Sequence, residues 1–256
     1  MIAGLSLGPA SVPVEPYRGA EEFRFVDRFI FHERSEQTRV LLQKVLVSRG
    51  VLVYGDSGSG KSSLVNAGLI PAAIDRGFAV DRVLVQPVLG SEIVLDRIPI
   101  GEEGPPFVPS SISDDADARR VAFSIDRFVG KLREIAKPHL LIFDQFEEIF
   151  TRFSGPGSQL RGQIFEMLLR LFYSKSLPLN LLLVFREEYF AKAVDSLALA
   201  PDWINQLFWL RPPSKNLAEK LIRAPFDTGN GPVTYRQKFS DETIRTLAVQ
   251  TGRARF

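Results

Sequence analysis

The sequence has no cysteine and few histidines. None of its 256 residues is cysteine, and only two are histidine. Disulfides and thiolate metal sites are therefore excluded. His32 and His139 are too isolated to suggest a zinc site, and we expect both to be structural. A chain without disulfides fits a cytoplasmic setting, which is our expectation for it.

An excess of charge of either sign is also lacking. The 32 lysines and arginines are balanced by 30 acidic residues, for a net charge of +2. This balance gives no signal for nucleic acid or for a membrane surface as the partner. We expect no signal peptide, and the strongest apolar run, "LPLNLLLVF", has about half the length that a membrane span requires.

What the sequence does contain is a series of short apolar runs that predict buried strands. The runs are VLVY (51–54), DRVLVQPVL (81–89), HLLIFD (139–144), LNLLLVF (179–185) and LFWL (207–210). Segments with helical spacing of apolar residues separate them. Because strands buried on both faces are typical of parallel sheets covered by helices, the pattern predicts an α/β fold.

The expected helices have different degrees of support in the sequence. One of them shows a clear apolar face, formed by Leu160, Ile164, Met167, Leu168, Leu171 and Phe172. Other helices are expected at 35–48, 61–75, 119–136 and 188–198. Residues 99–118 are rich in glycine, proline, serine and acids, and predict a long surface excursion.

The same pattern divides the chain into three parts. Residues 1–20 predict an extended leader because they are rich in glycine, proline and serine. Residues 21–213 carry the alternation of strands and helices. Residues 214–256 predict a small helical lid, whose last helix is capped by Ser240 and ends at Gly252.

The stretch "GDSGSGKSS" follows the first apolar run and matches the Walker A pattern G-x-x-x-x-G-K-[ST]. Its glycines let backbone N–H groups point at phosphates, its lysine reaches the β- and γ-phosphates, and its first serine is a ligand of Mg²⁺. A random chain of this length would contain the pattern in roughly one case in a hundred. We therefore expect nucleotide binding by Gly55, Asp56, Ser57, Gly58, Ser59, Gly60, Lys61, Ser62 and Ser63.

Asp144 ends the run "LLIFD", which is a Walker B pattern. A carboxylate at the end of a strand beside a phosphate loop can hold Mg²⁺ together with Ser62. The alternative is an aspartate that caps the next helix. The sequence between Lys61 and Asp144 leaves room for an additional strand and helix between the two Walker strands.

The residue after Asp144 is Gln145, where many P-loop ATPases place the glutamate that activates water. Two acids follow, Glu147 and Glu148. Either could orient water, with Glu147 our catalytic candidate, or both could be solvated charges at the start of a helix. This arrangement predicts slow or regulated hydrolysis.

Arg186 follows the last apolar residue of a strand expected between the two Walker strands. A cation there would face the γ-phosphate and distinguish a triphosphate from a diphosphate. The alternative is a surface ion pair with Glu187 or Glu188. No [NT]KxD motif is present, so guanine specificity is not expected.

Four segments in this order resemble the novel STAND NTPases, a bacterial branch of the signal-transduction ATPases related to AAA+ and NB-ARC proteins. They are "PYRGAEEFRFVDRFIFHERSE", "GDSGSGKSSLVNAGLIP", "LLIFDQFEEIFT" and "LLLVFREEYF". The resemblance covers about residues 16–225. It implies a P-loop sheet with strand order 5-1-4-3-2, binding of ATP and Mg²⁺, and Arg186 as the sensor-one arginine.

Two features depart from the family pattern. The family has Gly-Arg before the first strand, where this sequence reads "FHERSE"; Arg34 takes the place of the arginine as a nucleotide-binding residue, but Glu33 replaces the glycine. Members of the family continue into a winged-helix region and sensor repeats. We therefore expect sensor or effector domains outside this chain, and self-association on activation.

The resemblance favours an ATP-dependent signalling switch, with bacterial defence as a setting that it suggests. A P-loop kinase or motor ATPase with rapid turnover is one alternative. A nucleotide-binding scaffold that never hydrolyses is another. The sequence leaves these three hypotheses open.

Overall fold

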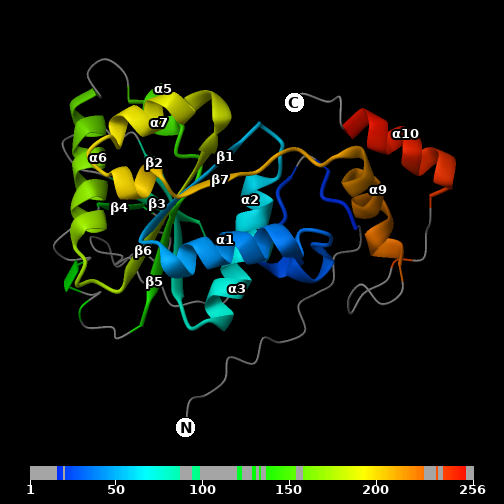
Figure 1. Cartoon of the computed structure of the whole chain (residues 1–256), viewed down its shortest axis with the longest axis horizontal. Coiled ribbons are helices and arrows are strands. Elements are labelled where there is room, and N and C mark those ends of the chain that lie inside the picture. The colour runs from blue at the N-terminus through cyan, green and yellow to red at the C-terminus, as the bar shows by residue number, and fades with distance from the viewer. Residues whose placement is uncertain are drawn as a thin grey trace, which may run out of the picture.

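The computed structural model describes residues 16–19, 21–86, 94–98, 120–122, 129–130, 133, 137–153, 158–227, 235 and 239–251. Among them a sheet of seven strands runs in the order β4-β3-β2-β5-β6-β1-β7 (Figure 1). The strands are β1 (Gly50–Gly55), β2 (Ala79–Gln86), β3 (Val94–Ile98), β4 (Arg120–Ala122), β5 (His139–Phe143), β6 (Leu179–Arg186) and β7 (Leu207–Trp209).

Helices cover the sheet and follow it in sequence. The α-helices are α1 (Ser35–Val47), α2 (Lys61–Ser63), α3 (Ile70–Asp75), α5 (Glu148–Thr151), α6 (Ser158–Tyr173), α7 (Phe190–Ser196), α8 (Pro201–Ile204), α9 (Lys215–Arg223) and α10 (Asp241–Thr251). The other helical segments are η1 (Phe25–Ile30), η2 (Leu64–Leu69), η4 (Glu187–Tyr189) and η5 (Ala224–Phe226).

Five of the strands are parallel and have the order expected from the sequence. β1 pairs with β6 on one side and with β7 on the other, and β5 pairs with β6 and with β2. In the order of the chain these strands form the sheet 2-3-4-1-5, which is the expected order read from its other edge. The expected P-loop fold is thereby confirmed.

The sheet extends beyond β2 by two strands that the sequence did not predict. β3 pairs antiparallel with β2, and β4 pairs antiparallel with β3. The expectation of a helix over residues 119–136 is wrong for β4 (Arg120–Ala122), although residues 129, 130 and 133 are helical. The extended backbone of β4 gains ladder hydrogen bonds from β3, and pairing of this kind outweighs local helix preference. The expected excursion at 99–118 lies outside the described residues.

Each central strand contributes alternate residues to two apolar cores. In β5, Leu141 and Phe143 pack with α6, whereas Leu140 and Ile142 pack with α1 and α3. The helices lie on opposite faces of the sheet, as Figure 1 shows for α6 and α1. All six residues of the expected apolar face of α6 are buried in the first core. Burial on both faces leaves the strand ends as the places where polar side chains can gather.

The helix after the phosphate loop runs from Lys61 to Asp75, as expected, but its middle turn is a π-helix, η2. Such segments are frequent at functional sites. All six residues of η2 are buried, including Asn66.

Two polar side chains complete the ends of helices at the opposite edge of the sheet. Arg49 donates to the carbonyl groups of Leu171, Phe172, Ser174 and Leu177, at and beyond the end of α6. The side-chain amide of Asn180 donates to the carbonyls of Val45 and Ser48 at the end of α1. These bonds satisfy acceptors that a helix leaves open at its C-terminus.

The C-terminal part is helical, as expected. Ser214 accepts a hydrogen bond from the amide of Leu217 at the start of α9, and the expected cap of Ser240 on α10 is confirmed by a bond of 3.2 Å from the amide of Thr243. Gly252 lies outside the described residues, as do residues 1–15 of the expected leader. The division at 213/214 stays a prediction.

Within the described residues, no helix combines the length and the apolar composition that crossing a membrane requires.

The approach of β1 to α8 yields a test of the packing. A Cβ added to Gly50 would lie 2.4 Å from Trp203 Nε1, and the Trp203 side chain is fully buried and stacks on Phe172. We expect Gly50→Ala to lower the free energy of unfolding by about 1–3 kcal/mol, because the indole has no room to move. Gly162→Ala is the control: its Cβ meets open space on α6, and it should raise stability by roughly 0.5–1 kcal/mol. Chemical denaturation measures both, and equal effects would contradict this account.

Candidate functional site

The phosphate loop connects the end of β1 with the start of α2. Gly58 and Gly60 have positive φ angles of 73° and 90°, which glycine adopts without steric cost. Lys61 Nζ donates to the carbonyl oxygens of Gly55 at 2.9 Å and Asp56 at 2.8 Å. The lysine therefore folds back over its own loop. Burial lowers the pKa of Lys61, and the negative charge of Glu147 opposes this shift.

Asp144 directly follows β5 and lies beside the start of α2. Ser62 Oγ is 3.4 Å from Asp144 Oδ1, although the two residues are 82 positions apart in the sequence. The amide of Gln145 donates to the same oxygen at 2.9 Å, and Gln145 itself has a φ of 50°. The structure thus brings together the two residues expected to share a metal ion.

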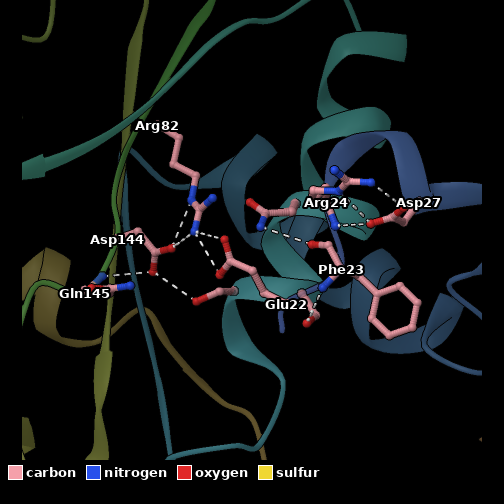
Figure 2. Close-up of polar contacts among 10 residues, drawn as sticks. Glu22, Phe23, Arg24, Asp27, Arg82, Asp144 and Gln145 are labelled. Carbon is pink, nitrogen blue, oxygen red and sulfur yellow. Dashed lines mark hydrogen bonds and ion pairs between the residues drawn. The ribbon is translucent and has the colours of Figure 1, made fainter. Parts of the chain in front are cut away.

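Arg82 is a third member of this cluster, and we did not predict it from the sequence. Its Nε donates to Asp144 Oδ2 at 2.9 Å, and its Nη2 contacts the same oxygen (Figure 2). The Nη2 also donates to Glu22 Oε1 at 3.0 Å. A charged residue within the apolar run of β2 was the available signal, since a buried arginine requires an acidic partner. The identity of that partner could not be read from the sequence.

Arg186 and Glu147 form an ion pair at the same edge of the sheet. Arg186 ends β6 opposite Gly55, and its Nε lies 3.2 Å from Glu147 Oε1. A longer contact of 3.9 Å joins its Nη1 to Glu188. The expected alternative partner, Glu187, instead accepts a hydrogen bond from Trp209 Nε1.

The two acids after Gln145 differ in their surroundings. Burial raises the pKa of Glu147 above its usual value, and the positive charges of Arg186 and Lys61 oppose this shift. Glu148 pairs with Arg152 at 3.0 Å, one helical turn further along. Of the two, Glu147 therefore faces the cations of the phosphate loop, and Glu148 belongs to a surface pair.

Arg34 also reaches the phosphate loop. It is buried, its Nη2 lies 3.4 Å from the carbonyl oxygen of Ser59, and burial lowers its pKa. Glu33, which stands where the family has glycine, has a φ of 58°. This left-handed conformation explains the preference for glycine at this position. The chain keeps that conformation with a glutamate and still directs Arg34 at the loop.

A segment at the N-terminal side, Glu21–Asp27, crosses the start of α2; we call it the N-terminal strap. Its Phe23 amide donates to Ser63 Oγ at 3.1 Å, and its Phe23 carbonyl accepts from the Asn66 side chain at 3.2 Å (Figure 2). The fully buried Asp27 accepts a hydrogen bond of 2.8 Å from the amide of Arg24. The strap thus lies against the residues next to Ser62.

The donor set at this edge fits a nucleotide and a magnesium ion. Ser62 and Asp144 supply the oxygen ligands that Mg²⁺ prefers. In the part of the chain that the structure describes, Ser59 Oγ and Glu147 Oε2 are buried without a hydrogen-bond partner. The described residues contain no group of three or more His, Cys, Asp or Glu residues that could hold a metal ion by themselves. A magnesium ion here would therefore also depend on phosphate or water oxygens.

Two solved structures share this fold. The Walker-type ATPase PABY2304 of Pyrococcus abyssi is 16% identical, with 89% of this chain and 65% of that chain covered and a TM-score of 0.54. The chain thus spans slightly less than two thirds of that ATPase. A chain in the HORMA:CdnC:Trip13 complex of E. coli MS115-1 is 13% identical, with coverages of 91% and 78% and a TM-score of 0.53. At such identities the likeness shows the fold alone.

Among curated proteins, none matches the chain. The family model of novel STAND NTPase 1 matches residues 16–253, which include the phosphate loop, Asp144, Arg186 and the helical C-terminal part. The chain is therefore a nucleotide-binding P-loop NTPase and belongs to the novel STAND NTPase 1 family.

Proposed function

We propose that the chain is an ATP-binding signalling switch of the STAND class, in which slow or regulated hydrolysis controls self-association. One observation carries the proposal: Ser62 and Asp144 meet at 3.4 Å at the sheet edge that also holds Lys61 and Arg186. Membership of the family supports nucleotide binding by this edge. The adenine nucleotide is proposed because the sequence lacks the motif that reads guanine.

In this proposal the loop from Gly55 to Ser63 holds the phosphates through its backbone amides, and Lys61 turns from its own carbonyls to the β- and γ-phosphates. Arg34 contributes a further positive charge behind Ser59. Ser62 and Asp144 would hold Mg²⁺, which neutralises phosphate charge when it is bound. These residues are supplied by three different elements, so the site requires the folded sheet.

We assign the orientation of the attacking water to Glu147. Its carboxylate is half-buried near Lys61 and one of its oxygens has no hydrogen-bond partner among the described residues, whereas Glu148 is paired with Arg152. The ion pair with Arg186 must loosen before Glu147 can act as a base, because the guanidinium lowers the basicity of the carboxylate. This requirement supports hydrolysis that is slow until a trigger rearranges the pair.

Arg186 is proposed to sense the third phosphate. It lies opposite Gly55, where the phosphate loop begins, and half of its side chain is exposed. A γ-phosphate would compete with Glu147 for the guanidinium, so loss of that phosphate would return Arg186 to Glu147. This exchange gives ATP and ADP different contacts, which any nucleotide switch requires.

The output of the switch is the least constrained part of the proposal. Self-association, a bacterial defence role and a cytoplasmic location follow from the family resemblance. One structural neighbour belongs to a multi-protein assembly, the HORMA:CdnC:Trip13 complex, which agrees with a role in assembly. Rapid hydrolysis in the absence of any trigger would favour a kinase or motor instead.

We expect Lys61→Ala to lower ATP affinity at least about 100-fold, because contacts of roughly 1.5–3 kcal/mol each to two phosphates are lost. The fold should persist, since Lys61 bonds only carbonyl groups of its own loop in the described structure. Calorimetric titration with ATP and Mg²⁺ measures the affinity. Lys175→Ala, in an exposed turn before β6 at the opposite sheet edge, is the control. Unchanged affinity in folded Lys61→Ala would refute the proposed site.

Glu147→Gln should reduce ATP hydrolysis about 100-fold or more, the usual contribution of a general base, and should leave ATP bound. Glu148→Gln is the matched control and should change hydrolysis less than about threefold, because its partner Arg152 is on the surface. Single-turnover phosphate release measures both. A larger loss in Glu148→Gln would transfer the role to that residue.

Arg186→Ala should weaken binding of a non-hydrolysable ATP analogue more than binding of ADP, by about 1.5–3 kcal/mol. The control is Arg152→Ala, an arginine of similar exposure that is also paired with a glutamate. Paired titrations with the two nucleotides supply the comparison. Equal losses for both nucleotides would show that Arg186 does not read the third phosphate.

A further inference from the structure

We propose that Arg82 is a gate on the magnesium site, and that it couples Mg²⁺ binding to the N-terminal strap through Glu22. The inference rests on the proposed function, because it needs a nucleotide and Mg²⁺ beside Asp144. Its evidence is a separate set of contacts on β2, outside the Walker motifs.

The starting point is that both oxygens of Asp144 are engaged. Arg82 binds Oδ2 through Nε and Nη2, while Oδ1 accepts from the Gln145 amide and lies 3.4 Å from Ser62 Oγ. The side chains of Arg82 and Asp144 are 4% and 1% exposed. An arginine stays charged at any physiological pH, and a buried charge must keep a partner.

Magnesium and Arg82 compete for the same carboxylate. A metal ion held between Ser62 and Asp144 adds two positive charges close to a guanidinium that is already there. Coulomb repulsion between them is strong where water is excluded. Occupation of the metal site therefore weakens the contact of Arg82 with Asp144, and by linkage Arg82 weakens the binding of Mg²⁺ to the same extent.

Glu22 supplies the alternative partner that makes the exchange feasible. Its two carboxylate oxygens lie 3.0 and 3.2 Å from Arg82 Nη2, and its side chain is 39% exposed (Figure 2). When Mg²⁺ takes Asp144, Glu22 is the carboxylate that remains to neutralise the guanidinium. Glu22 should thus favour Mg²⁺ binding, whereas Arg82 opposes it.

The strap gives this exchange a route to the helical C-terminal part. Phe23, next to Glu22, bonds Ser63 beside the metal ligand Ser62. Upstream of the strap, the Tyr17 hydroxyl donates to the carbonyl of Ile222 at 2.5 Å, and its ring stacks on Phe239. A tighter pair between Arg82 and Glu22 would therefore hold the strap, and the segment that contacts α9, more firmly.

The test compares the affinity for a non-hydrolysable ATP analogue in Mg²⁺ with that in EDTA, because the ratio cancels general effects on the phosphate loop. We expect Arg82→Gln to raise this ratio about fivefold or more and Glu22→Gln to lower it by a similar factor, at the lower end of usual couplings between sites. Glu21→Gln is the control: this acid neighbours Glu22 but pairs with Arg18, and the ratio should not change. A structural role for both residues would shift both variants in the same direction.

A second measurement follows hydrogen exchange of residues 16–24 in the wild type. Exchange should slow when Mg²⁺ joins the bound analogue, and Glu22→Gln should remove that part of the protection. If Arg82→Gln does not fold, the Glu22→Gln ratio decides alone, and an unchanged ratio overturns the gate. A wild type that binds no nucleotide contradicts the proposed function together with the gate. A wild type with normal Mg²⁺-dependent binding and variants that match it contradicts the gate alone.

Discussion

The site depends on a buried carboxylate that has to be neutralised. Asp144 follows a strand whose residues are buried on both faces, so water cannot solvate its charge. An unpaired carboxylate in such a place costs several kcal/mol, and positive or polar groups must converge on it. Ser62, Arg82 and the Gln145 amide all do so. The position of α2 relative to the sheet is thereby tied to β2 and to the N-terminal strap.

The sequence predicted the parallel sheet and the phosphate loop because both leave local signals. Apolar runs of strand length mark β1, β5 and β6, and the spacing of Gly55, Gly60 and Lys61 is contiguous. The order of the strands came from the family resemblance, and the structure confirms it. β3 and β4 left no such signal, since short antiparallel edge strands are defined by their pairing more than by their own pattern.

The partners of the charged residues could not be read from the sequence either. Arg186 was expected to meet a sequence neighbour, Glu187 or Glu188, but its shortest ion pair is with Glu147, across a connection between strands. Arg82 meets Glu22 and Asp144, which are 60 and 62 positions away. Such pairs are set by the register of the sheet, where a shift of one residue turns each side chain to the other face. Only the folded chain specifies them.

These internal pairs bear on how a nucleotide can act on the protein. Lys61 bonds the carbonyls of its own loop, Arg186 is paired with Glu147, and Arg82 is shared between two carboxylates. A nucleotide with Mg²⁺ must exchange these contacts for its own, so part of its binding free energy is used to rearrange charged side chains. A ligand shifts a conformational equilibrium only by its difference in affinity for the two arrangements. Since each exchanged pair joins different elements, the rearrangement reaches β2, β6 and the N-terminal strap, and the phosphate site is coupled to segments that no phosphate touches.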